Sequence, residues 1–227
     1  MKPEQDINFD LGLPIDDLPK TNNCIIKVIG VGGGGGNAVN HMYNQGIEEV
    51  TFVVCNTDQQ ALNHSPVPTK ILIGEGLGAG NKPSVALAAA EAAREDITTM
   101  LNDGTKMVFI TAGMGGGTGT GAAPFVASIA RELGILTVGI VTIPFLFEGK
   151  RKIRQALEGV AAMSENVDAL LVIHNERLCS VYPDLELSNA FGLADNVLTN
   201  AARGIVEIIR IDGHINVDFA DVCTIMR

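Results

Sequence analysis

Residues 111–124 read Thr-Ala-Gly-Met-Gly-Gly-Gly-Thr-Gly-Thr-Gly-Ala-Ala-Pro. The run lies between an apolar, strand-like segment at 107–110 and a helical pattern at 125–133. A glycine-dense turn between a strand and a helix leaves backbone N–H groups free to point into a concavity, with the helix N-terminus behind them. Thr118 and Thr120 add hydroxyl donors. The run therefore predicts a phosphate-binding loop rather than a flexible linker, because linkers are flanked by polar sequence.

Glycine is concentrated in three places. It makes up 26 of the 227 residues, and sixteen of the 26 lie at 30–36, 74–80 and 113–121. Three such stretches suggest one ligand enclosed by several strand ends. The formal net charge of −10 argues against a nucleic acid or an anionic membrane as the principal partner. Because 46% of the residues are hydrophobic and the first residues lack the apolar segment of a signal peptide, we expect a soluble, cytoplasmic globule.

Apolar runs alternate with helical patterns along most of the chain. Near-continuous apolar runs are typical of strands that are covered on both faces of a parallel sheet. We expect strands at 25–31, 50–55, 107–112, 136–143 and 167–173, and helices at 37–44, 84–102, 125–133, 188–210 and from about Glu148. This order predicts an α/β fold with a doubly wound, mostly parallel sheet and a ligand at the carboxyl edge. The apolar positions of helix 188–210 cover so much of its circumference that we expect burial on more than one side.

The first strand and helix also match a dinucleotide-binding pattern. Gly30, Gly32 and Gly35 satisfy G-x-G-x-x-G, and Asp58 follows the second strand, where a ribose-binding acid belongs. Alone, this pattern would indicate a nicotinamide-dependent dehydrogenase. The fingerprint is weak in so glycine-dense a segment, and it leaves the larger glycine loop at 113–121 unexplained. A dehydrogenase is therefore the alternative reading.

A cluster of cations begins the helix that follows the strand at 136–143. Lys150, Arg151, Lys152 and Arg154 lie in its first turns. Cations at a helix N-terminus oppose the macrodipole, so this placement costs stability unless an anion lies there. A bound phosphate would explain the cluster, and a solvated basic face is the alternative.

Several common kinds of site are missing from the sequence. It has no G-x-x-x-x-G-K-[ST], which excludes a P-loop nucleotidase, and no G-x-S-x-G elbow. No His or Cys spacing suggests that the protein itself binds a metal. The four cysteines have no C-x-x-C spacing and lie in or beside apolar runs, as reduced structural thiols do.

Taken together, the motifs resemble those of the tubulin/FtsZ family of GTP-dependent cytoskeletal polymers. The signature of that family is similar to Gly-Gly-Gly-Thr-Gly-Thr-Gly at 115–121. Five further motifs recur in the same order in its bacterial members, at 32–38, 55–58, 76–80, 144–149 and 216–221. The resemblance covers 24–227 and implies a Rossmann-like GTPase domain. It also implies that the chain stops inside a helix, before a second subdomain that is missing here.

The resemblance assigns nucleotide-binding roles to individual residues. It implies that the phosphates are held by Gly33, Gly34, Gly35, Gly36, Asn37, Gly117, Thr118 and Gly119. It places Glu148 and Lys152 at the ribose, Asn175 near the base, Phe191 stacked on the purine and Asp195 paired with it. A carboxylate can accept both N1–H and the exocyclic amine of guanine, whereas adenine has no N1–H, so Asp195 would favour GTP or GDP. Taken alone, Asp195 reads as an ordinary exposed helix acid. Many relatives have arginine in place of Lys152, which keeps the charge but lacks the bidentate fork.

The glycine loops carry no carboxylate that could orient a water molecule for hydrolysis. In the family that group comes from the next subunit, so the resemblance implies that Asn216, Asp218 and Asp221 act catalytically on a neighbour's GTP. The alternative for Asp218 and Asp221, at i and i+3, is a helix-capping pair. Phosphoryl transfer also leads us to expect Mg²⁺ bridging the phosphates.

The resemblance extends to partners and location. It implies head-to-tail self-assembly into filaments at the mid-cell division ring, and contacts with other division proteins through a C-terminal part that is absent here. Neither nucleic acid binding nor direct membrane insertion is expected. We divide the chain into a tail at 1–22, a GTP-binding domain at 23–186, a core helix at 187–210 and a catalytic loop with a partial helix at 211–227. Hydrolysis by this form is expected to be weak, and a nucleotide-binding module without chemistry is a further alternative.

Overall fold

The computed structural model describes residues 25–47, 50–182, 187–210 and 224. Its strands are β1 (Ile26–Val31), β2 (Thr51–Asn56), β3 (Thr69–Leu72), β4 (Met107–Gly113), β5 (Leu136–Ile143) and β6 (Ala169–His174). Its α-helices are α1 (Gly32–Asn44), α2 (Gln59–His64), α3 (Pro83–Ala92), α4 (Arg94–Leu101), α5 (Thr118–Glu132), α6 (Lys150–Ser164), α7 (Asn175–Val181) and α8 (Leu187–Arg210). A short 3₁₀ helix, η2 (Leu146–Glu148), precedes α6.

The strands form one sheet in the order β3-β2-β1-β4-β5-β6, and all five pairings are parallel. The prediction of a doubly wound, mostly parallel sheet is therefore confirmed. The strand order reverses between β1 and β4, the point at which doubly wound sheets bind ligands. In the register of these central strands, Gly30 pairs with Val54 on one side and with Thr111 on the other.

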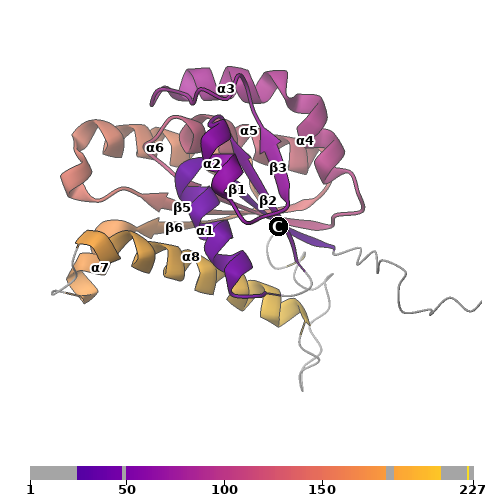
Figure 1. Ribbon diagram of the computed structural model, residues 1–227. Coiled ribbons are helices and arrows are strands. Elements are labelled where there is room, and N and C mark those ends of the chain that lie inside the picture. The colour runs from indigo at the N-terminus through magenta and orange to yellow at the C-terminus, as the bar shows by residue number, and fades with distance from the viewer. Residues whose placement is uncertain (1–24, 48–49, 183–186, 211–223, 225–227) are drawn as a thin grey trace, which may run out of the picture.

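Helices cover both faces of the sheet (Figure 1). On one face, alternate strand residues such as Ile29 and Ile110 pack with apolar residues of α3, α4, α5 and α6. On the other face, Val28 and Phe109 pack with α1, with α2 and with Leu198 of α8. Because the central strands are buried on both faces, they read as continuous apolar runs in the sequence. Cys55 belongs to this core, and its burial raises the pKa of the thiol to about 12, as expected for a structural cysteine.

Two helices begin earlier than the sequence predicts. Helix α1 begins at Gly32 rather than at residue 37, and α5 begins at Thr118 rather than at residue 125. Glycine and proline disfavour helix interiors, yet α5 contains Pro124. Close packing overrides propensity here: a Cβ on Gly35 would lie 2.2 Å from the carbonyl oxygen of Thr111. Glycine thus allows these helix starts to approach the sheet backbone.

Several short elements were not predicted from the sequence. The sequence predicted no element between residues 55 and 84, but α2 and β3 lie there, and α7 follows β6 directly. The predicted helix at 84–102 is two helices, because α3 ends at Ala92 and α4 begins at Arg94. In the described part of α8, buried Ala190 and Leu198 face the protein while Asn196 and Asn200 are exposed. The burial of several of its apolar positions, Ala202, Ile205, Val206 and Ile209, lies outside what the structure describes, so the expectation of burial on more than one side stays a prediction.

Candidate nucleotide site at the carboxyl edge

Two helix N-termini meet at the carboxyl edge of the central strands. Helix α1 follows β1, and α5 follows β4 after the glycine loop. Neither N-terminus has a side-chain cap, and neither first turn contains an acid. The two ends abut, because a Cβ on Gly32 would lie 2.8 Å from the backbone nitrogen of Gly119. Uncapped N–H groups and two convergent helix dipoles make this edge electrostatically suited to an anion.

The glycines at this edge have two different functions. A Cβ on Gly33, Gly36 or Gly116 would meet nothing within 4 Å, so these positions border open space. A Cβ on Gly119 would lie 2.4 Å from the carbonyl oxygen of Gly113, and Gly35 is equally restricted by Thr111. The first group leaves room for a ligand, whereas the second group lets the two helices reach the sheet.

A cavity of about 250 Å³ opens beside the two N-termini. It is lined by Gly34, Asn37, Gly113, Met114, Gly116, Thr142, Pro144, Glu148, Asn175, Phe191, Ala194, Asp195 and Leu198. Six residues of the predicted site are among them: Gly34, Asn37, Glu148, Asn175, Phe191 and Asp195. Gly33, Gly35, Gly36, Gly117, Thr118, Gly119 and Lys152 lie nearby without lining the cavity, and their phosphate and ribose contacts stay predictions. Asn216, Asp218 and Asp221 lie outside the described residues.

One end of the cavity carries groups suited to a base. Phe191 is half-exposed, and its ring packs edge-on against buried Phe145 at a centroid distance of 5.4 Å. Asn175 is buried, and its Oδ1 has no hydrogen-bond partner in the described part of the chain. An unpaired buried acceptor is costly unless a ligand supplies a donor. This end of the cavity therefore offers an aromatic face and an unpaired polar atom.

Asp195 lies at the same end, on α8. Burial raises the pKa of its carboxyl to about 6, and the nearby His41 of α1 acts in the opposite direction. His41 itself is held by Asn196, whose Oδ1 lies 2.6 Å from the imidazole Nε2. The Asp195 carboxylate is therefore partly desolvated, which strengthens any hydrogen bond that it accepts from a ligand.

The basic start of α6 already has a counterion. Lys152 Nζ lies 3.1 Å from Glu148 Oε2, while Glu148 Oε1 accepts a hydrogen bond from the backbone nitrogen of Phe145 at 3.0 Å. Lys152 thus has a counterion without a phosphate, and a phosphate at this cluster stays a prediction. Lys150, Arg151 and Arg154 show no ion pair with any other described residue.

The second glycine stretch lies beside the phosphate loop. A Cβ on Gly117 would lie 2.9 Å from the Cβ of Ala79, and the Thr57 and Thr118 hydroxyls are 2.7 Å apart. The sequence did not single out Thr57, although it follows directly after β2. Its neighbour Asp58 caps α2 by accepting hydrogen bonds from the next helix N–H groups. Capping accounts for the acid on which the dehydrogenase alternative depended, so that reading is not favoured.

Sequence reasoning assigned no site role to several residues that line the cavity. Thr142 lies near the end of β5, Pro144 directly follows β5, and Met114 directly follows β4. Their position at the end of a buried strand was a usable signal, because parallel strands end at a common edge. Ala194 and Leu198 carried no such signal, because only packing shows which face of α8 lines the cavity.

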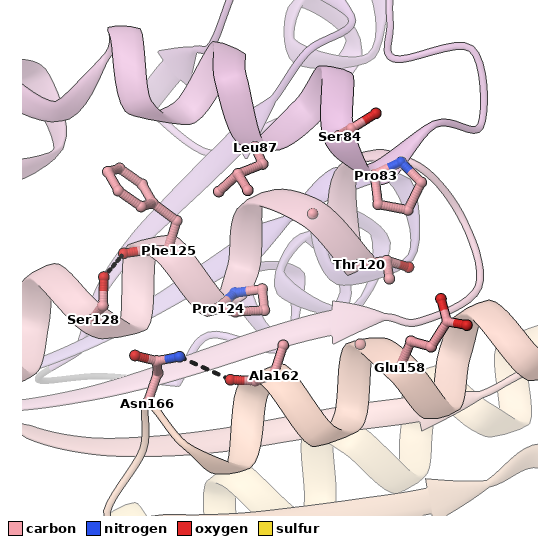
Figure 2. A pocket seen from close by; sticks show the side chains of 12 residues that line it. Pro83, Ser84, Leu87, Thr120, Pro124, Phe125, Ser128, Glu158, Ala162 and Asn166 are labelled. Atoms are coloured by element: carbon pink, nitrogen blue, oxygen red, sulfur yellow. Dashed lines mark hydrogen bonds between the residues drawn. The ribbon is translucent and has the colours of Figure 1, made fainter.

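A second cavity, of about 380 Å³, lies between α3, α5 and α6. Figure 2 shows Leu87 reaching from α3 toward Pro124 and Phe125 of α5, with Glu158 and Ala162 on the opposite helix. Its lining is mainly apolar. Ser128 Oγ donates a hydrogen bond to the carbonyl oxygen of Phe125, and Asn166 Nδ2 donates one to that of Ala162. This cavity has none of the predicted nucleotide-binding residues in its lining.

The described residues hold no group of three or more His, Cys, Asp or Glu residues that could bind a metal ion. None of the helices in that part of the chain has the length and apolar character needed to cross a membrane.

The chain is similar to known proteins in both sequence and structure. A cell division protein FtsZ from Porphyromonas gingivalis is 61% identical over 229 residues, which are 97% of this chain and 48% of that protein. The protein of the same name from Azotobacter vinelandii is 52% identical over 93% of this chain and 54% of its own length. The solved structure "FtsZ dimer, empty" from M. jannaschii superimposes with a TM-score of 0.84 at 47% identity, covering 88% of this chain and 60% of that one.

The chain thus spans about half the length of the curated relatives that it matches. Residues 25–183 match the family model described as the GTPase domain of the Tubulin/FtsZ family. This match includes both uncapped helix N-termini and the glycine loop between them. The chain belongs to the tubulin/FtsZ family, and most of its described residues form that family's GTPase domain.

Proposed function

We propose that this chain binds GTP and GDP at the carboxyl-edge cavity and is the nucleotide-binding part of a filament-forming GTPase of cell division. The observation that carries the proposal is the meeting of two uncapped helix N-termini at one cavity, with a desolvated carboxylate at its other end. The helix ends suit the phosphates of a nucleotide, and the carboxylate suits its base.

Guanine fits the base end better than adenine does. The Asp195 carboxylate is an acceptor, and guanine presents N1–H and an exocyclic amine as adjacent donors. Asn175 Oδ1 is a second acceptor that lacks a partner. Phe191 would stack on the purine, with its ring held by Phe145. Adenine has no N1–H, so it would leave acceptors at this end unpaired.

The remaining predicted contacts follow from the position of the base. Glu148 lines the same cavity and is paired with Lys152, so these two residues would lie at the ribose. The phosphates would lie against the first turns of α1 and α5, at 33–37 and 117–119. Magnesium would take most of its ligands from phosphate oxygens, since no cluster of acidic side chains is present in the described part. When bound, it would neutralise phosphate charge.

Hydrolysis requires a group that this cavity does not supply. Its two carboxylates are Glu148, which is already paired with Lys152, and Asp195 at the base end. We therefore place the catalytic step between adjacent chains of a head-to-tail filament, where Asn216, Asp218 and Asp221 of one chain would orient water at the GTP of the next. The names of the relatives, cell division protein FtsZ, support this role and a location at the mid-cell ring.

Nucleotide identity tests the proposal most directly. Calorimetry on this chain, stripped of nucleotide and supplied with Mg²⁺, should show GDP and GTP binding and much weaker binding of ADP and ATP. Equal affinity for guanine and adenine nucleotides would refute the assignment of the base end.

The shared catalytic site is tested in a full-length relative that contains the corresponding residues. GTP turnover per molecule should rise with protein concentration there and be very low in this chain alone. Replacing Asp221 by alanine should leave nucleotide affinity intact, whereas Thr118→Ala should lower it. A specific activity that stays constant over a hundredfold dilution would exclude a site completed between chains.

A further inference from the structure

The glycine loop is held from outside by one side chain of α6. The Nε2 of Gln155 donates hydrogen bonds to the carbonyl oxygen of Gly116 at 2.8 Å and to that of Gly115 at 3.2 Å. Both partners are carbonyl oxygens, so the amide must present its NH₂ group to the loop. Since that group has two hydrogens, it can serve both oxygens at once.

These bonds determine which way two peptide groups of the loop point. In a trans peptide the C=O of one residue and the N–H of the next point in opposite directions. Turning the oxygens of Gly115 and Gly116 toward Gln155 therefore turns the N–H groups of Gly116 and Gly117 away from α6. These two N–H groups have no hydrogen-bond partner in the described part of the chain, whereas Gly115 N–H donates to Thr120 Oγ1 at 2.9 Å.

The loop cannot fix these orientations by itself. Consecutive glycines flip their peptide planes at little steric cost, and a flipped plane would present a carbonyl oxygen to the ligand. An oxygen directed at a phosphate would repel it, whereas an N–H attracts it. Gly116 lines the carboxyl-edge cavity and borders open space there. The orientation of its peptide groups therefore bears directly on what the cavity can bind.

We propose that Gln155 is a positioning residue for nucleotide binding, which holds the phosphate loop with its N–H groups available to the phosphates. This inference rests on the proposed function. Gln155 does not line the cavity, so it acts through the loop rather than by touching the ligand. Neither the glycine pattern nor the family motifs single out this residue.

The test is GDP binding, measured by calorimetry, on this chain and on four variants. Gln155→Leu keeps the size of the side chain but has no donor, and it should weaken GDP binding about tenfold, as expected when two neutral hydrogen bonds no longer orient the loop. Gln155→Lys retains donors and should recover most of the affinity. Glu158→Gln, one turn further along α6, is the matched control and should bind as the unmodified chain does.

Gln155→Glu supplies a readout that a merely structural role would not affect. An ionised carboxylate facing two carbonyl oxygens repels them, but a protonated one donates a hydrogen bond. The GDP affinity of this variant, divided by that of the unmodified chain at each pH, should rise as the pH falls from 8 to 5. Taking the ratio removes the titration of Asp195. The charged residues within one turn of Gln155 on the same helix are Arg151, Lys152, Arg154 and Glu158, and residues 113–119 contribute no titratable group.

The outcomes separate this inference from the proposed function. If the unmodified chain binds neither GDP nor GTP, the proposed function fails. If it binds GDP and Gln155→Leu binds equally well, the function stands and the inference is overturned. If the leucine and lysine variants lose affinity equally and the glutamate ratio is independent of pH, Gln155 contributes only packing, which also overturns the inference. Thermal unfolding of each variant confirms that it is folded.

Discussion

Two cavities of the molecule differ in their polar groups, and this difference separates a ligand site from a packing defect. The carboxyl-edge cavity is the smaller, at about 250 Å³, and holds an unpaired Asn175 oxygen, a desolvated Asp195 and two uncapped helix ends. The cavity between α3, α5 and α6 is larger, at about 380 Å³, and is mainly apolar. Of these two, size and apolar lining would have favoured the cavity between α3, α5 and α6. Unsatisfied polar groups select the first, because only a ligand can satisfy them.

The largest effects should come from glycines, one at each cavity. Gly121→Ala would place a Cβ 2.1 Å from the carbonyl oxygen of Pro83, so we expect about 3 kcal/mol loss of unfolding free energy. Gly116→Ala has open space for its methyl group and should fold normally, but the methyl group would enter the carboxyl-edge cavity and lower GDP affinity at least tenfold. Denaturant unfolding and calorimetry on both variants measure this. If Gly116→Ala unfolds as easily as Gly121→Ala, the separation of the two glycine classes is wrong.

Replacing the acidic residues that line the two cavities should have a smaller effect on nucleotide binding. Asp195→Ala should weaken guanine nucleotide binding by about 1.5 to 3 kcal/mol, the usual contribution of hydrogen bonds to a charged group, and should leave weak adenine binding unchanged. Glu158→Gln in the second cavity should change neither. Competition binding with GDP and ADP gives both values. If Glu158→Gln weakened GDP binding as much as Asp195→Ala does, the assignment of nucleotide binding to the carboxyl-edge cavity alone would be wrong.

Protonating Asp195 at low pH should weaken GDP binding by as much as, or less than, replacing it by alanine does. Guanine binding needs the ionised carboxylate, whose pKa in the folded protein is raised to about 6. GDP affinity should therefore fall as the pH drops below about 6, by up to about tenfold per pH unit. The free energy of unfolding should change with pH in the opposite direction. Because the pKa is raised in the folded state, the folded chain binds this proton more tightly than the unfolded chain does. The stabilising contribution of Asp195 is therefore largest below about pH 4 and is lost as the pH rises toward 6. Asp195→Asn should flatten both profiles, and a persistent slope in that variant would assign the titration to another group.

The smallest effect should come from Leu87, which lines the second cavity from α3 and is 39% exposed. Leu87→Ala should cost about 1 kcal/mol or less of unfolding free energy, because half-exposed apolar side chains lose little burial. GDP binding should be unchanged. A clear loss of GDP affinity in this variant, at unchanged stability, would show that the second cavity communicates with the first.

The glycine loops at the carboxyl edge could be predicted from local sequence patterns. Asn175, Phe191 and Asp195 were expected at the site only because of the family resemblance, and all three line the cavity. The pairing of Glu148 with Lys152 and the hold of Gln155 on the loop were not predicted. The contact of Gln155 depends on where α6 lies relative to the loop after β4, which no local pattern encodes. The Glu148–Lys152 pair is an i,i+4 contact, so its spacing was a usable signal in the sequence. Asn216, Asp218 and Asp221 lie outside the described residues, and their role stays a prediction.

The sequence by itself determined that this chain alternates buried strands with helices and that glycine-rich turns follow β1 and β4, because apolar runs and glycine clusters are local patterns. Tertiary structure alone decided that α1 and α5 begin inside those glycine runs, and which glycines face a ligand. The distinction between Gly35, packed on Thr111, and Gly33, facing open space, is a matter of backbone approach between segments roughly 75 residues apart in the chain. Such approaches are set by how helices pack on the sheet, where a difference of one ångström separates a permitted methyl group from a forbidden one.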